Sequence, residues 1–267
     1  MKFQLYLTTA LLSGAAYILA LFATKELTSG MFPVAPAYPV FLFLVFFATT
    51  TALLLMLFRF YRGRWLYRAL FSLVAFLGLL KLFETVFPFE FSILLAALFL
   101  AGFFFISTVW THDVIVILAS AGIGSVFSLS FTEDIAFVIL LILSAYDVIA
   151  VFVTKHMMTL AHAMIRSQAT FALFVPERIG GFAASIASVR PGAGFLILGG
   201  GDIVLPMIYL SSVARTSMDT ALYGVAGALF GQFLNHLFLV QLRRPIPALP
   251  LITLGAIVGV VIGMELL

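Results

Sequence analysis

Residues 134–155 read DIAFVILLILSAYDVIAVFVTK, and this stretch decides the class of fold. Its only charged residue away from the two ends is Asp147. An α-helix rises about 1.5 Å per residue, so a stretch of this length crosses the roughly 30 Å of hydrocarbon in a bilayer. The pattern therefore predicts a membrane-spanning helix with one acidic group inside it.

The rest of the chain has the same character. Of its 267 residues 64% are apolar and only 9% are charged, whereas soluble domains have about 25% charged residues. This composition predicts an all-α membrane protein, a bundle of nine transmembrane helices. We place these helices at residues 3–24, 38–58, 67–88, 91–110, 114–130, 134–155, 194–214, 219–240 and 246–266. The chain has no Cys, which excludes disulfides and thiolate metal sites.

The basic residues predict the orientation. With nine crossings, eleven Lys and Arg fall on the side of the N-terminus and two on the other side. The positive-inside rule then places the N-terminus in the cytoplasm and the C-terminus outside, and it explains the basic balance without nucleic acid. We divide the chain into an N-terminal part at 1–155, a cytoplasmic connection at 156–193 and a C-terminal part at 194–267. The connection is expected to be an interfacial helix, a lid or a solvated linker.

Two acidic residues stand out because an ionisable group inside a membrane is costly and so indicates function. Asp147 lies eight residues before Lys155, and Asp202 lies eight residues after Gly194. On two antiparallel helices, both carboxylates would then be about 12 Å below the cytoplasmic helix ends. We expect Asp147 and Asp202 to face each other.

Two carboxylates in a poorly solvated site cannot both ionise cheaply, so this pair should share one proton. Such a pair suits peptide hydrolysis without a metal or other cofactor. The ionised Asp takes a proton from the attacking water, and the protonated Asp donates to the carbonyl oxygen. The alternative reading is a proton- or cation-coupled transporter or channel that uses the same buried aspartates.

Two short motifs lie on the same side of the membrane as the aspartates. A glycine run before Asp202 allows close packing and weakens the predicted helix, so that it can open for an extended substrate. A proline-rich segment at the start of the last helix leaves backbone groups unpaired beside the site. The motif residues are Gly199, Gly200 and Gly201, and Pro247, Ala248 and Leu249.

The remaining polar residues of the spans are given structural roles. Lys81 and Glu84, three residues apart on one helix face, are expected to pair or to reach the membrane surface. The polar group formed by Gln232, Asn235 and His236 is expected to hold helices together. Residues predicted at solvated span ends are Asp113, Glu133, Asp134 and Asp219.

Together, the motifs resemble those of the presenilin and signal peptide peptidase family of intramembrane aspartyl proteases. The resemblance rests on Tyr146-Asp147, on Gly199-Gly200-Gly201-Asp202 and on Pro247-Ala248-Leu249, in this order and on the sixth, seventh and ninth spans. It implies that Asp147 and Asp202 are catalytic. It also implies that Tyr146, the glycines and the Pro-Ala-Leu segment support the site or bind substrate.

The sequence also departs from that family. Gly200 occupies a position where eukaryotic members usually have a larger apolar residue, which predicts looser packing beside Asp202. The local sequence is closer to signal peptide peptidases, but the predicted orientation is that of presenilins. The short chain resembles a compact archaeal homologue in a prokaryotic cell membrane. The implied substrates are transmembrane helices in the bilayer, favoured with their N-terminus outside.

Overall fold

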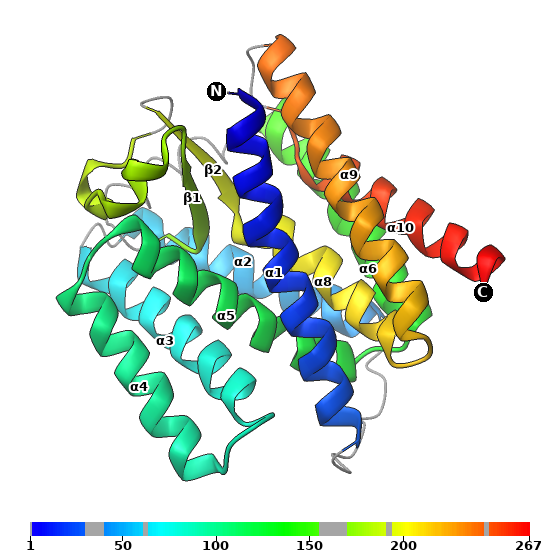
Figure 1. Ribbon diagram of the computed structural model, residues 1–267, viewed down its shortest axis with the longest axis horizontal. Coiled ribbons are helices and arrows are strands. Elements are labelled where there is room, and N and C mark those ends of the chain that lie inside the picture. Colours follow the sequence, from blue (N-terminus) through cyan, green and yellow to red (C-terminus); the bar gives the residue numbers. More distant parts are fainter. Residues whose placement is uncertain (1, 30–39, 61–63, 155–169, 191–193, 243–245) are drawn as a thin grey trace.

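The computed structural model shows a bundle of α-helices joined to one small β-hairpin (Figure 1). It describes residues 2–29, 40–60, 64–154, 170–190, 194–242 and 246–267. Nine α-helices lie in these ranges: α1 (Lys2–Ser29), α2 (Val40–Phe60), α3 (Arg64–Phe83), α4 (Phe89–Phe105), α5 (Val109–Leu129), α6 (Glu133–Ile149), α8 (Gly200–Ala214), α9 (Met218–Leu242) and α10 (Leu249–Leu266). Each of the nine predicted spans overlaps one of them.

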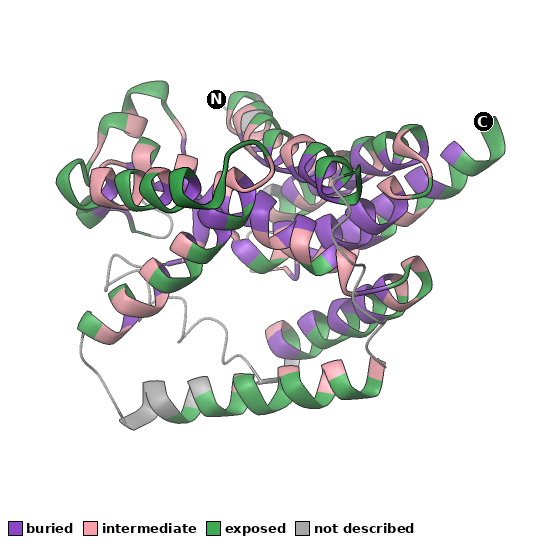
Figure 2. Ribbon diagram, turned by 90° about the horizontal axis from the view of Figure 1, so that it is seen from below, coloured by how far each residue is buried: buried purple, intermediate pink, exposed green. Residues whose placement is uncertain are grey.

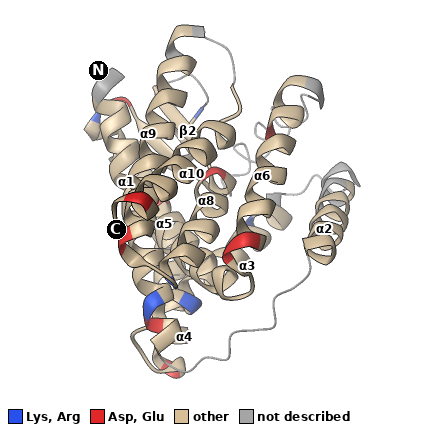
Figure 3. Cartoon of the chain, turned by 90° about the vertical axis from the view of Figure 1, so that its right-hand side faces the viewer, with Lys and Arg blue, Asp and Glu red and all other residues tan. Residues whose placement is uncertain are grey.

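By length and composition, six of the nine helices could cross a membrane, namely α1, α3, α5, α6, α9 and α10. The apolar stretches of α2, α4 and α8 are shorter. The chain is a multi-pass membrane protein by this measure, and its charged residues are few (Figure 3). One predicted pair is confirmed, because Lys81 Nζ lies 2.8 Å from Glu84 Oε2.

Helix α5 forms the centre of the bundle, where it packs against α1, α3 and α8. From Ala119 onward its buried face consists of small residues, such as Ser120, Gly122 and Gly124, which let neighbouring backbones come close. Gly122 on α5 faces Gly78 on α3 so closely that a Cβ on Gly122 would overlap the Gly78 carbonyl oxygen. At its end, α5 is fixed to α8 because Arg215 donates to the carbonyl oxygens of Ser128 and Phe131, both at 2.9 Å.

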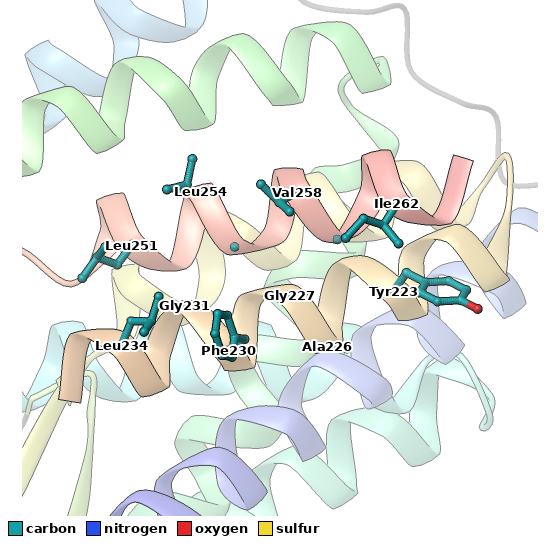
Figure 4. Close-up of a pocket in the computed structure, with 12 residues that line it drawn as sticks. Tyr223, Ala226, Gly227, Phe230, Gly231, Leu234, Leu251, Leu254, Val258 and Ile262 are labelled. Atoms are coloured by element: carbon teal, nitrogen blue, oxygen red, sulfur yellow. The ribbon is translucent and has the colours of Figure 1, made fainter. Parts of the chain in front are cut away.

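Among the described elements, helices α9 and α10 share the most extensive contact. Gly227 on α9 and Gly255 on α10 leave no room for a Cβ at their crossing. The outer side of this crossing is an apolar groove of about 420 Å³ (Figure 4). It is lined by residues such as Phe230 and Leu254 and contains neither Asp147 nor Asp202, so the groove is not the acidic site.

Helix α2 lies at the edge of the structure, where it contacts α6 (Figure 2). Phe43 packs edge-on against Phe131, with ring centroids 5.1 Å apart. Large apolar side chains such as Phe41 and Phe46 are exposed on α2. Exposed apolar residues of this kind are expected where a helix faces lipid.

The all-α prediction is wrong for one segment, because β1 (Ala172–Pro176) and β2 (Phe195–Gly199) form an antiparallel hairpin. The predicted helix at 194–214 therefore starts later, at Gly200, since the residues before it are extended. Two short 3-10 helices, Ile179–Ala183 and Ile186–Ser188, lie between the strands. Residues 156–169 and 191–193 of the predicted connection lie outside the described residues.

Candidate active site

Asp147 is buried, with 7% of its surface exposed, near the end of α6. Its Oδ2 accepts a hydrogen bond of 3.3 Å from the backbone N–H of Leu249. Leu249 is the first residue of α10, where the backbone N–H groups have no partner within the helix. A helix start also carries partial positive charge, so this position favours a carboxylate.

The backbone changes directly after Asp147. The α-helix ends at Ile149 and continues as a π-helix over Ala150–Thr154. Single π-turns of this kind are rare and often lie at functional sites. Here the π-turn begins less than one turn beyond the buried carboxylate.

Asp202 occupies the first turn of α8, three residues after the N-cap Gly199. Its carboxylate lies beside the backbone of Gly199. An acidic residue at this position often reaches back to the N-cap in this way. Because the helix starts at Gly200, Asp202 is at a helix end, and the prediction that it lies deep within a regular helix is wrong.

The structure nevertheless brings the two aspartates together, as predicted. Helices α6, α8 and α10 pack against one another in pairs (Figure 1). Asp147 and Asp202 are close enough for the charge of one to act on the other. Two acidic groups, each at the positive end of a helix, therefore lie within electrostatic range of each other on the packed helices α6 and α8.

The three glycines have different roles from the predicted loosening of a helix, because they form a strand-to-helix junction. Gly199 ends β2, and a Cβ there would lie 3.1 Å from Asp202 Oδ2. A Cβ on Gly200 would lie 2.6 Å from the Phe171 carbonyl oxygen, which already accepts the Gly200 N–H at 2.9 Å. Gly201 is exposed, and a Cβ there would meet nothing within 4 Å.

The Pro-Ala-Leu segment lies beside Asp147. Pro247 and Leu249 are buried, and Ala248 is the N-cap of α10. The last helix starts at Leu249 and not at residue 246, because the prolines prevent an earlier regular turn. The Leu249 N–H brings this segment to the carboxylate.

Tyr146 differs from its neighbour, because half of its surface is exposed. Successive residues of a helix point about 100° apart, so Asp147 faces inward while Tyr146 does not. The supporting role of Tyr146 stays a prediction.

Sequence reasoning missed the surroundings of three buried residues. Tyr17 on α1 is buried and close enough to interact electrostatically with Asp202, and no motif in α1 indicated this. His112 and Asp113 on α5 are completely buried, which contradicts the prediction that Asp113 is solvated. The available signal for a buried pair was the occurrence of adjacent His and Asp residues between two apolar stretches.

A helical membrane bundle with two adjacent carboxylates is the arrangement of an aspartic peptidase that acts inside the membrane. The sequence model for the family described as signal-peptide peptidase, presenilin aspartyl protease matches residues 6–266. The chain therefore belongs to this family and is an intramembrane aspartic endopeptidase.

Two solved structures are similar over 98% of this chain and 98% of theirs. Both are described as a presenilin family intramembrane aspartate protease, one in space group C222 and the other in P2. The first gives a TM-score of 0.68 at 23% identity, and the second gives 0.67 at 26% identity. A comparison with curated proteins gave no match.

Proposed function

We propose that Asp147 and Asp202 are the catalytic pair and that they hydrolyse peptide bonds within transmembrane helices of other proteins. The observation that carries this proposal is that the two carboxylates are close enough to interact electrostatically. Asp147 accepts the Leu249 N–H at the start of α10, and Asp202 lies in the first turn of α8. Close like charges with fixed donors favour a state in which the pair binds one proton.

The pair then supplies an acid and a base at once. The ionised carboxylate takes a proton from water, the water oxygen attacks the peptide carbonyl carbon, and the protonated carboxyl donates to the carbonyl oxygen. In the tetrahedral intermediate, the first carboxyl gives its proton to the amide nitrogen while the second removes one from a hydroxyl. The C–N bond breaks, which releases an acid and an amine and restores the pair.

The hairpin supports an extended position for the substrate. The Gly200 N–H donates to the Phe171 carbonyl oxygen, which makes these two residues a hydrogen-bonded pair of the ladder. In an antiparallel ladder such pairs alternate with pairs whose backbone N–H and C=O groups point away from the partner strand, and Phe174 and Ile197 form one of these outward pairs. On β1 the outward Phe174 N–H is taken by Asp113. On β2, within the described part of the chain, no backbone group pairs with Ile197 on its outer side.

A peptide strand paired with this edge of β2 would continue past Gly199 towards Asp202. Such pairing gives new hydrogen-bond partners to the backbone groups of a substrate, which lose their partners within the helix when it opens. Substrate peptides with single amide-to-ester changes test the idea. We expect the KM to rise about twofold to tenfold at every second position before the cut, the net value of one hydrogen bond. Equal effects at all positions would contradict strand pairing.

The catalytic pair is tested with purified protein in detergent and a labelled peptide of one transmembrane span. Asp147→Asn and Asp202→Asn should each lose at least 100-fold in kcat, because each removes one partner of the proton exchange. Asp219→Asn, at an exposed carboxylate, is the matched control and should cleave normally. Cleavage that persists in either site variant, with the fold retained, would remove the proposed mechanism.

The basic residues support the finer topology, with the N-terminus and the 156–193 connection in the cytoplasm of a prokaryotic, archaeal-type cell and the C-terminus outside. This orientation favours substrates whose N-terminus is outside. One model span presented in both orientations in vesicles measures the preference. Equal cleavage of the two would contradict it.

A further inference from the structure

A second pair of ionisable groups lies in the bundle, away from Asp147 and Asp202. His112 and Asp113 follow the first turn of α5, and both are 0% exposed. The His112 ring stacks between Phe71 of α3 and Phe174 of β1, at centroid distances of 5.4 and 4.7 Å. The aromatic rings therefore cover both faces of the imidazole.

Hydrogen bonds join this pair to the hairpin. Asp113 Oδ1 accepts the Phe174 N–H at 2.9 Å and lies 3.3 Å from His112 Nδ1. His112 Nε2 lies 2.9 Å from the Thr170 carbonyl oxygen. A carbonyl oxygen only accepts, so Nε2 must carry a hydrogen and donate it.

This assignment limits how protons are distributed in the pair. With Nε2 protonated, Nδ1 is either a donor to Asp113 or an acceptor from a protonated Asp113. In both cases one proton lies between His112 and Asp113, and the pair carries no net charge. The second oxygen of Asp113, Oδ2, is buried without a hydrogen-bond partner among the described residues.

Buried pairs of this kind contribute little net stability, because desolvation offsets their attraction, and the unpartnered oxygen adds to the cost. Their contacts do fix a geometry. The Thr170 carbonyl is one residue before Phe171, whose own carbonyl accepts the Gly200 N–H. Gly200 is two residues before Asp202, so only a short chain of contacts separates the two sites.

We propose that His112 and Asp113 are positioning residues for the catalytic centre. They hold β1 on α5, and through the strand pairing they fix β2 and the start of α8, where Asp202 lies. Asp113 also occupies the outer edge of β1, which leaves the edge of β2 for the substrate. This inference rests on the proposed function of Asp202 and of the β2 edge.

The test compares variants that differ in one contact. His112→Phe keeps the ring stack but removes the bond to Thr170, whereas His112→Gln places an amide N–H near the position of Nε2 and should restore it. Asp113→Leu removes the acceptor for Phe174, and Asp113→Asn keeps an oxygen there. Val225→Ala, in the buried part of α9, serves as a control for general loss of stability.

The readouts are kcat, KM and the distribution of cut positions along one labelled span. We expect His112→Phe and Asp113→Leu to lower kcat at least tenfold and to spread the cuts over neighbouring peptide bonds. His112→Gln and Asp113→Asn should recover most of the parent pattern. Hydrogen exchange of residues 170–176 and 195–199 should be faster in the first two variants only.

Two outcomes would overturn the proposal. One is a parent-like kcat and cut pattern in His112→Phe and Asp113→Leu. The other is that Val225→Ala, at a matched loss of thermal stability, spreads the cuts equally. Either result can be told from a failure of the proposed function, because Asp147→Asn and Asp202→Asn are measured in the same assay and must remain inactive.

Discussion

The backbone N–H of Leu249 donates a hydrogen bond to Asp147 Oδ2 over 3.3 Å, and this bond joins the start of α10 to the acidic residue of α6. Through this bond the Pro-Ala-Leu segment contacts Asp147 directly. The segment starts a helix late enough to leave a free N–H beside the carboxylate. Among the described residues, the hydrogen bond that orients Asp147 comes from the backbone of Leu249.

Removal of this one N–H should therefore slow cleavage. Replacing the Leu249 amide by an ester, through the α-hydroxy analogue of leucine, deletes the donor and keeps the side chain. A hydrogen bond to a charged group contributes about 1.5–3 kcal/mol, so we expect kcat to fall about 10- to 100-fold. The same ester at Ile252, whose N–H bonds the Ala248 carbonyl, is the control. Equal losses at both positions would show a general effect on α10.

Of the two neighbouring glycines before Asp202, only one should be sensitive to replacement by alanine. In Gly200→Ala the new Cβ would collide with Phe171, so the hairpin must move, and we expect a loss of about 1–3 kcal/mol of stability together with activity. In Gly201→Ala the Cβ points into open space, so stability should change by less than about 0.5 kcal/mol. Thermal unfolding and peptide cleavage measure both effects. Equal destabilisation would contradict this view of the junction.

Much of the helical part could be predicted because six of the helices are long and apolar enough to be recognised alone, and the other three are shorter apolar stretches. Asp147 and Asp202 could be identified as candidates for the same reason, since charged residues are rare in apolar stretches. Their predicted proximity rests on equal depth in two antiparallel helices. The reasoning about equal depth was wrong in detail. It assumed a regular helix from residue 194, whereas residues 195–199 pair with β1.

The hairpin could not be predicted because its two strands, ALFVP and FLILG, are short apolar runs without a period that separates a strand from a helix. Their pairing depends on residues far apart in the chain. Asp113 was assigned to solvent because it follows an apolar span, yet its partner Phe174 comes from β1. A single span gives no information about such a contact.

Arg215 provides a prediction about stability that is separate from catalysis. Its guanidinium donates to the carbonyl oxygens of Ser128 and Phe131 at the end of α5, where backbone acceptors lack partners. Arg215→Met should lower the free energy of unfolding by about 1–3 kcal/mol and leave kcat unchanged at a temperature where both proteins are folded. Arg178→Met, at an exposed position, is the comparison. A loss of kcat without a loss of stability would point to a different role.

The crossing of α9 and α10 should control activity from outside the acidic site. A Cβ on Gly227 would overlap the Gly255 carbonyl oxygen and lie 2.9 Å from its carbonyl carbon, so Gly227→Ala must push the two helices apart. Because α10 carries the Leu249 N–H that holds Asp147, we expect kcat to fall together with thermal stability. Gly102→Ala on α4 adds a Cβ that meets nothing within 4 Å and should change neither quantity. If Gly227→Ala cleaved like the parent protein, the position of α10 would not be what holds Asp147 in its active orientation.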